Sequence, residues 1–150
     1  MARIVPDIIP PTQDLTLVTP DMTVRDAARL MRENNIAAVM IVDGERLSGI
    51  MTERDIAARV VAQGRNPDIT LVSEVMTPDP DTLSPGDMAA SALRMMREHN
   101  YRHLPVVENG RPVGMVSIRD LYAVVQKELE ADLANRDAYI FGEHYGATAS

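Results

Sequence analysis

The sequence predicts an α/β (α+β) fold built from two copies of one β-α-β-β-α unit. The first observation is an internal repeat: residues 16–56 align with residues 81–121 at an offset of 65, without a gap. The second is the apolar pattern of each copy, which has helical spacing in one stretch and runs consecutively in two shorter ones. The third is a glycine-containing turn between the two shorter stretches. Alternating helices and strands of this kind indicate a layered α/β architecture.

Twelve identical pairs support the repeat, among them matched glycines and matched Arg-Asp dipeptides. Two helices with the same amphipathic spacing would explain the apolar pairs, but not the matched glycine or Arg-Asp. The pairs therefore indicate one structural unit that occurs twice. The identical pairs are Pro20/Pro85, Ala27/Ala92, Arg29/Arg94, Met31/Met96, Arg32/Arg97, Glu33/Glu98, Asn35/Asn100, Val42/Val107, Arg46/Arg111, Gly49/Gly114, Arg54/Arg119 and Asp55/Asp120.

In the first copy, Pro20 closes a short extended piece, and Thr23 with Asp26 forms a capping-box pattern at a helix start. The turn at Asp43-Gly44 separates two apolar strands, and Gly64 ends the last helix. The predicted elements are a strand over 15–19, a helix over 24–34, strands over 38–42 and 47–51, and a helix over 53–62.

The second copy repeats this order. Its central strands, like those of the first copy, are apolar on consecutive residues, so we expect both faces of each sheet to be covered. Arg46 and Arg111 fall in the strand–strand turns and are expected at the surface. The predicted elements are an extended piece at 82–83, a helix over 87–99, strands over 103–107 and 112–117, and a helix from 118 onward.

The chain divides into five parts on this basis. Because the connector contains Ile69, Val72 and Val75, we expect it to pack on the module. In the tail, Tyr139-Ile140-Phe141 is expected either to dock on its own module or to contact a partner subunit. The parts are an N-terminal segment (1–13), a first motif (14–65), a connector (66–78), a second motif (79–134) and a tail (135–150).

The composition excludes several classes of function. A net charge of −7 argues against a protein that coats DNA. The chain has no cysteine, and its three histidines lack the spacing of zinc sites, so no metal is expected. No apolar run approaches the length of a membrane span, and the proline-broken N-terminus is not a signal peptide, which favours the cytoplasm. No phosphate loop or nucleophile elbow is present, so no enzyme activity is expected.

The repeated signatures are Gly49-Ile-Met-Thr52-Glu-Arg-Asp55 and Gly114-Met-Val-Ser117-Ile-Arg-Asp120. Together with Met76-Thr77-Pro78 and the run from Arg102 to Val107, they resemble the CBS (cystathionine-β-synthase) motif, and the resemblance covers about residues 14–130. It implies a tandem CBS pair, also called a Bateman module, in which the two motifs pack as a pseudo-twofold pair. Each signature contains Ser/Thr-x-x-Asp, which alone is also an ordinary helix cap.

Four such patterns occur, and only two of them recur at the offset of 65 residues after an apolar strand with its glycine. Those two, Thr52–Asp55 and Ser117–Asp120, are the functional candidates, whereas Thr23–Asp26 and Ser84–Asp87 are interpreted as caps. A carboxylate at a helix start can accept hydrogen bonds from ribose hydroxyls, and the free N–H groups there favour a phosphate. The resemblance implies that the two aspartates hold ribose and that adenine lies between apolar strands.

Positive charge for phosphates is unequal between the copies. Arg102 and His103 precede Leu-Pro-Val in the second copy, whereas the first copy has Ala37-Ala38 there, so we expect two unequal clefts. Alternatively, His103 is a strand residue bonded to a neighbouring carbonyl, and the two signature arginines form a solvated helix face. The predicted ligand-binding residues are Thr52, Arg54, Asp55, Thr82, Arg102, His103, Leu104, Pro105, Ser117, Arg119 and Asp120.

The expected function is a non-catalytic regulatory module that binds AMP, ADP or ATP and requires no cofactor. An alternative is a structural dimerisation module with empty clefts, and another is a binder of S-adenosylmethionine or NAD. The resemblance also implies a homodimer formed through helix faces. Because nearly the whole chain is the module, its output is expected to pass to a separate effector protein.

Overall fold

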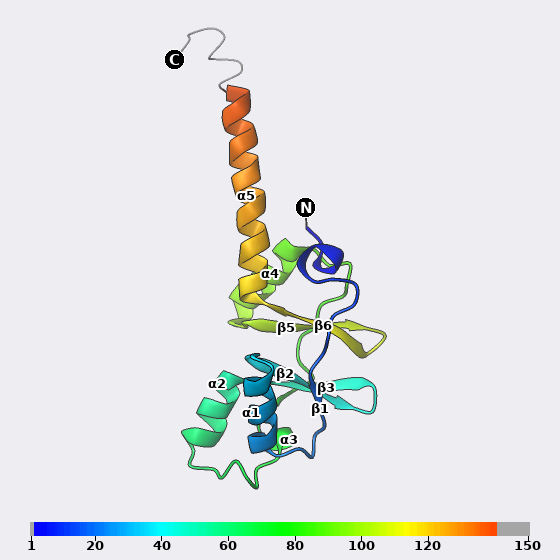
Figure 1. Ribbon diagram of the computed structural model, residues 1–150, viewed down its shortest axis with the longest axis vertical. Helices are drawn as coiled ribbons and strands as arrows, with labels where there is room; N and C mark the ends of the chain where they lie inside the picture. Colours follow the sequence, from blue (N-terminus) through cyan, green and yellow to red (C-terminus); the bar gives the residue numbers. More distant parts are fainter. Residues whose placement is uncertain (1, 141–150) are drawn as a thin grey trace.

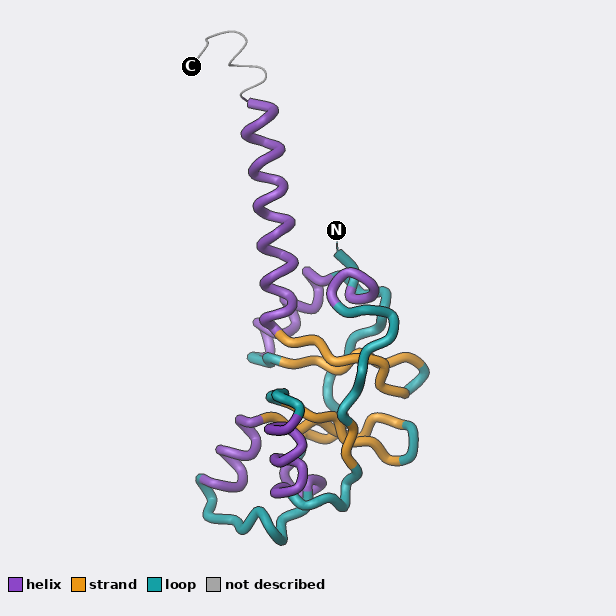
Figure 2. Tube along the Cα trace, viewed as in Figure 1, coloured by secondary structure: helices purple, strands orange, loops and turns teal. Residues whose placement is uncertain are grey.

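The computed structural model describes the backbone of residues 2–140 and the side chains of residues 2–136. Two motifs stack so that their strands meet in the middle and their helices lie on the two outer sides (Figures 1 and 2). The α/β fold class and the paired repeat predicted from the sequence are confirmed.

The first motif forms a four-stranded sheet in the order β1-β2-β3-β4. The pairing of β1 with β2 is parallel, and the other two pairings are antiparallel. Its helices pack on the outer face of this sheet (Figure 1). The elements are β1 (Leu17–Val18), α1 (Val24–Glu33), β2 (Ala38–Asp43), β3 (Arg46–Thr52), α2 (Glu53–Ile56) continued by the wider turn η2 (Ala57–Val61), α3 (Val72–Val75) and β4 (Thr77–Pro78).

The second motif has a two-stranded antiparallel sheet, extended by a single parallel bridge between Leu83 and Val106. The extended piece predicted at 82–83 is therefore reduced to one bridging residue, Leu83, whose N–H donates to Pro105 O at 2.8 Å. The elements are α4 (Ala89–His99), β5 (His103–Glu108), β6 (Arg111–Ser117) and α5 (Ile118–Ile140).

The repeat extends to local irregularities of the backbone. The register of the hairpin shifts between Ile41 and Val42 in the first motif and between Val106 and Val107 in the second. Asn35 and Asn100 both adopt left-handed backbone angles, with φ of 52° and 59°. Asparagine tolerates this conformation after a helix better than most residues, which explains why the repeat keeps the same residue there.

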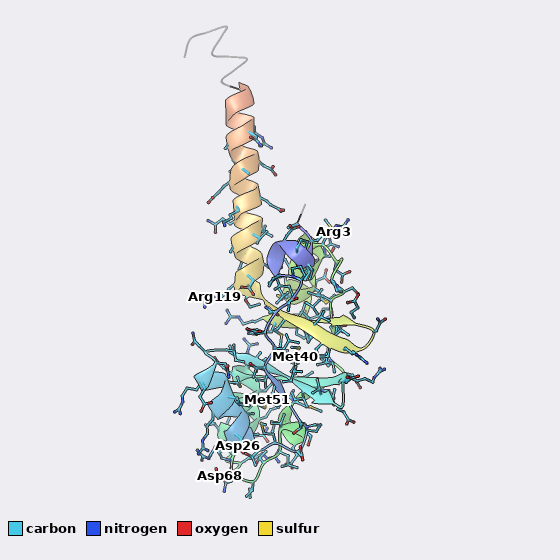
Figure 3. All side chains as sticks on the ribbon, turned by 45° about the vertical axis from the view of Figure 1, so that its right-hand side comes forward. Arg3, Asp26, Met40, Met51, Asp68 and Arg119 are labelled. Carbon is cyan, nitrogen blue, oxygen red and sulfur yellow. The ribbon has the colours of Figure 1, made fainter. Side chains whose placement is uncertain are left out.

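The central strand of the first motif is buried on both faces, as its consecutive apolar residues predict. Val39 and Ile41 belong to the core beneath the helices, with exposures of 1% and 0%. Ala38 and Met40 are also buried but lie outside that core, on the opposite face of the strand. Figure 3 places Met40 between the two sheets and Met51 deeper in the first motif. The face of β2 turned toward the second motif is therefore apolar.

Each motif is covered by a segment that precedes the other motif in the chain. The connector places Val72 in the core of the first motif, and the N-terminal segment, through the single turn η1 (Ile4–Ile8), places Ile4 in the core of the second. The Val72 N–H donates to Met22 O and the Ile4 N–H donates to Asp87 O, both at 2.8 Å. Met22 and Asp87 stand 65 residues apart, so the two cover segments use the same docking position.

The expected packing of the connector is confirmed for Val72 and Val75, both fully buried, while Ile69 is 75% exposed. The predicted surface position of the two turn arginines is also confirmed, since Arg46 and Arg111 are exposed. The turns nevertheless touch. The Leu47 N–H donates to Gly110 O at 3.0 Å, and Arg111 pairs with Glu45 at 2.5 Å.

The last helix, predicted from 118 onward, reaches into the segment predicted as the tail. The tail was predicted from residue 135, but α5 continues through Ile140, because no glycine or proline interrupts residues 118–140. Figure 1 shows its distal half extending away from the second motif. Leu129 and Leu133 on this half are 59% and 47% exposed. The side chains of Tyr139-Ile140-Phe141 lie outside the described residues.

Candidate functional site

The candidate site is built on the two turns where a strand passes into the last helix of each motif. The Thr52 hydroxyl accepts from the Asp55 N–H (3.3 Å), and the Asp55 carboxylate accepts from the Thr52 N–H (2.9 Å). Ser117 and Asp120 form the same reciprocal pair at 3.2 and 3.1 Å. In each pair the aspartate Oδ2 accepts the capping hydrogen bond. The other carboxylate oxygen, Oδ1, takes no part in the cap and can accept from a ligand.

Of the two patterns interpreted as plain caps, Thr23–Asp26 caps a helix, whereas Ser84–Asp87 closes a turn before α4, whose N-cap is Met88. The Thr23 hydroxyl accepts from the Asp26 N–H at 3.2 Å at the start of α1. The Ser84 N–H donates to the Asp87 carboxylate at 2.8 Å. None of these four residues lines either of the clefts described next.

The first cleft has a cavity of about 270 Å³ and lies between the start of α2 and the start of β5. Its walls come from both motifs, so it exists only in the pair. Its lining residues are Ala37, Ile50, Thr52, Glu53, Arg54, Asp55, Thr77, Pro80, Asp81, Asn100, Tyr101, Arg102, His103 and Leu104.

The second cleft is its pseudo-twofold counterpart, with a larger cavity of about 520 Å³ between the start of α5 and the start of β2. Figure 3 shows Arg119 at the base of α5, on the side where the motifs meet. The lining residues are Gln13, Asp14, Leu15, Thr16, Asn35, Ile36, Ala37, Ala38, Met40, Arg102, His103, Met115, Ser117, Ile118, Arg119 and Asp120.

Three residues line both clefts: Ala37, Arg102 and His103. The sequence analysis expected the Arg102-His103 pair to favour one cleft, but the pair stands on a wall that the two clefts share. The inequality between the clefts therefore arises at other positions. Glu53 in the first cleft corresponds to Ile118 in the second, and Asp81 corresponds to Thr16, so the first cleft carries more negative charge.

His103 is half-buried at this shared wall. Burial lowers the pKa of its imidazole, and the neighbouring Arg102 guanidinium lowers it further, whereas the carboxylates of Asp120 and Glu53 act in the opposite direction. The two carboxylates come from different clefts. The ring is therefore mainly neutral at neutral pH, and Arg102 is the permanent cation of the shared wall.

Most of the predicted residues gather in the clefts. Thr82 and Pro105 line neither cleft. Thr82 is exposed just before the Leu83 bridge, and Pro105 is buried in β5 opposite Met115. Arg54 and Arg119 are exposed residues at the mouths of their clefts. The first cleft takes Thr52, Arg54, Asp55 and Leu104, the second takes Ser117, Arg119 and Asp120, and both take Arg102 and His103.

Sequence reasoning missed several lining residues. The Tyr101 hydroxyl donates to the Asp81 carboxylate at 2.9 Å, a bond that raises the pKa of this phenol. Gln13 contacts β6, where its side-chain oxygen accepts from the Met115 N–H at 2.8 Å. Matched repeat positions signalled one such pair, because Asn35 and Asn100 are identical and line opposite clefts.

Within residues 2–136, no group of three or more His, Asp or Glu side chains is placed to hold a metal ion. Over the same part of the chain and through the end of α5, no helix is long and apolar enough to cross a membrane.

Two matched clefts between repeated α/β motifs, each with a capped carboxylate at a helix start, define a tandem module of two paired motifs. The family model for the CBS domain matches the chain twice, at residues 5–62 and 72–127. The chain therefore belongs to the CBS domain family, and it is a CBS pair.

Relatives of known sequence agree. CBS domain-containing protein YhcV of Bacillus subtilis is 38% identical over 110 residues, which cover 73% of this chain and 78% of that protein. CBS domain-containing protein CBSCBSPB2 of Arabidopsis thaliana is 43% identical over 107 residues, which cover 70% of this chain. The match spans only 20% of the length of CBSCBSPB2.

Two solved structures also resemble the chain. The CBS domain protein PAE2072 from Pyrobaculum aerophilum, complexed with AMP, has a TM-score of 0.74 and 27% identity, covering 84% of this chain and 97% of that one. The CBS domain pair of protein MJ0100, in complex with 5′-methylthioadenosine and S-adenosyl-L-methionine, has a TM-score of 0.72 and 27% identity, covering 81% and 98%.

Proposed function

We propose that this protein is a non-catalytic regulatory module that binds an adenine nucleotide, AMP, ADP or ATP, in the clefts between its motifs. The observation that carries the proposal is the pairing, in each cleft, of a capped aspartate with the Arg102-His103 wall. The aspartate Oδ1 supplies an acceptor for ribose hydroxyls, and Arg102 supplies charge for phosphate. Binding would report nucleotide levels to a separate effector protein.

The clefts suit such a ligand in size and lining. Small-molecule sites of roughly 300–1,000 Å³ hold most of a ligand's surface, and cavities of about 270 and 520 Å³ are of this order. Ile50 and Leu104 in the first cleft, and Met40 and Met115 in the second, provide apolar surface for a base. The adenosyl ligands of PAE2072 and MJ0100 support the same class of ligand.

A thermal-shift panel of AMP, ADP, ATP, S-adenosylmethionine and NAD tests the proposal on the full chain. A ligand at about a hundred times its Kd stabilises the folded state by roughly 2.7 kcal/mol, which raises the melting temperature by several degrees. We expect an adenine nucleotide to give such a shift. Absence of a shift with every adenine compound would leave the structural dimerisation module as the better reading.

Variants of the two site aspartates locate the ligand. Asp55→Ala and Asp120→Ala each remove a helix cap as well as a ligand group, and loss of a cap alone costs about 0.5–2 kcal/mol. The matched control is therefore Asp87→Ala, since Asp87 caps a turn outside both clefts. The ligand-induced shift should fall in the site variants and persist in the control.

Self-association through the helix faces belongs to the same proposal. Tyr122, Leu129 and Leu133 leave large apolar surfaces exposed on α5. Apolar side chains gathered on one element are typical of an interaction surface. We expect a homodimer, which light scattering of the full chain would show as twice the mass of one chain.

A further inference from the structure

The shared wall has an unequal composition in the two motifs. Ala37 and Arg102 stand 65 residues apart and occupy the same repeat position. Each of them lines both clefts, so this position adjoins the pseudo-twofold axis between the clefts. A residue placed there by one motif reaches its own cleft and that of its neighbour.

One consequence is a shortage of cations. If both motifs carried arginine at this position, the shared wall would hold two guanidinium groups, one for each cleft. In this chain the first motif contributes Ala37, so Arg102 is the single arginine that faces both clefts. Arg54 and Arg119 each line one cleft only, at the start of α2 and of α5, and they are exposed, as Arg102 is. His103, the other shared residue, is mainly neutral at neutral pH, for the reasons given above.

We infer that the two clefts compete for Arg102, so that one phosphate-bearing ligand binds tightly per chain and a second phosphate-bearing ligand binds weakly. This inference rests on the proposed function and describes its regulation. A phosphate in one cleft draws the guanidinium toward itself and places negative charge beside the common wall. The other cleft then meets a second phosphate with only its own arginine, Arg54 or Arg119, and against a nearby like charge.

A ligand without phosphate escapes this competition. It needs only the ribose acceptor and the apolar walls, and each cleft has its own set: Asp55 with Ile50 in the first, and Asp120 with Met115 in the second. The module is thus able to hold one nucleotide together with one uncharged adenosine compound. Its two clefts would then report on the ratio of two adenosine compounds rather than on the concentration of one.

Calorimetric titration of the full chain with AMP and, separately, with adenosine tests the inference. We expect two AMP molecules per chain whose stepwise affinities differ by about 5- to 150-fold, the usual range for coupled sites. We expect adenosine to bind the AMP-loaded chain as well as it binds one site of the free chain. Ala37→Arg, which gives the second guanidinium, should bring the two AMP affinities within a few-fold of each other.

Arg102→Gln provides a second route if Ala37→Arg fails to fold. This variant should lower the tighter AMP affinity toward the weaker one and leave adenosine binding unchanged. Arg94→Gln makes the same change of charge on the exposed face of α4, outside both clefts, and should alter neither. Two equally tight AMP sites in the natural chain would overturn the inference while upholding the proposed function. Failure of AMP, ADP, ATP and adenosine alike to bind would overturn both.

Discussion

The Arg59 guanidinium lies 3.9 Å from the Asp55 carboxylate, measured from Nε to Oδ1. The same guanidinium donates to the backbone carbonyls of Val75 and Met76, at 3.0 and 3.1 Å. Arg59 therefore connects the aspartate of the first cleft to the cover segment of its motif. The matched position in the second motif is Val124, so Asp120 has no such link.

Replacing Arg59 by alanine should weaken ligand binding in the first cleft and destabilise the fold. Two charge-assisted hydrogen bonds are lost, and because the side chain is 47% exposed we expect a cost of only about 1–2 kcal/mol. Urea unfolding measures this cost. Arg29→Ala is the control, since Arg29 makes one exposed pair with Asp26 at 3.7 Å and should change stability by less than about 1 kcal/mol. Equal effects would contradict the linking role of Arg59.

Replacing Ile4 by alanine should destabilise the second motif although Ile4 precedes the first. The side chain is fully buried, and such truncations cost about 2–5 kcal/mol through lost burial and the cavity left behind. Ile69→Ala is the matched control, because Ile69 lies in the connector with 75% exposure and should cost less than about 0.5 kcal/mol. Chemical denaturation measures the stability of the two variants. Equal unfolding midpoints would contradict the packing of the N-terminal segment in the core of the second motif.

Replacing Gly49 by alanine should strain the contact between β3 and β4. An added Cβ would meet the Met76 side chain and would lie 3.0 Å from the backbone oxygen of Thr77, which cannot move alone. Overpacking of this kind costs about 1–3 kcal/mol. Gly86→Ala has no atom within 4 Å of the added Cβ and should be nearly neutral. Thermal melts compare the melting temperatures of the two variants. An unchanged melting temperature for Gly49→Ala would show that β4 can move away from β3 without loss of stability.

His103 should make the protein less stable as the pH falls below neutrality. Burial lowers its pKa in the folded state below the ordinary value of 6.5, despite the facing Asp120 and Glu53, so the unfolded chain binds the proton more readily. The loss therefore begins near pH 6.5 and grows until the lowered pKa is passed. We expect His103→Gln to lose less stability between pH 7.5 and 5.5 than the natural chain does in parallel urea titrations. Identical losses would contradict the depressed pKa.

The element order of both motifs could be predicted because it depends on local signals. The Asp43-Gly44 turn and the Thr23 cap lie next to the elements that they bound. The consecutive apolar residues of β2 likewise indicated a strand buried on both faces. Local signals do not show which distant part of the chain a segment packs against. Nothing near Ile4 therefore indicated that it packs on the second motif.

The candidate site divides in the same way. Asp55 and Asp120 were found because the repeat matched them and each follows a strand with its glycine. That Arg102 faces both clefts follows from its place near the pseudo-twofold axis, a three-dimensional relation that no spacing in the sequence expresses. For the same reason, Gln13 was missed, since it enters a cleft from the N-terminal segment. Tyr101 was missed because its repeat counterpart, Ile36, is apolar.

The crossed cover segments make the two motifs a reciprocal domain swap within one chain. A cut after Gly64 would leave the first motif without Val72 and would leave the second without Ile4. Neither fragment would hold a complete core, but each would carry the piece that the other lacks. Mixed together, the halves should reassemble by fragment complementation, and the clefts would form only in that reunited complex.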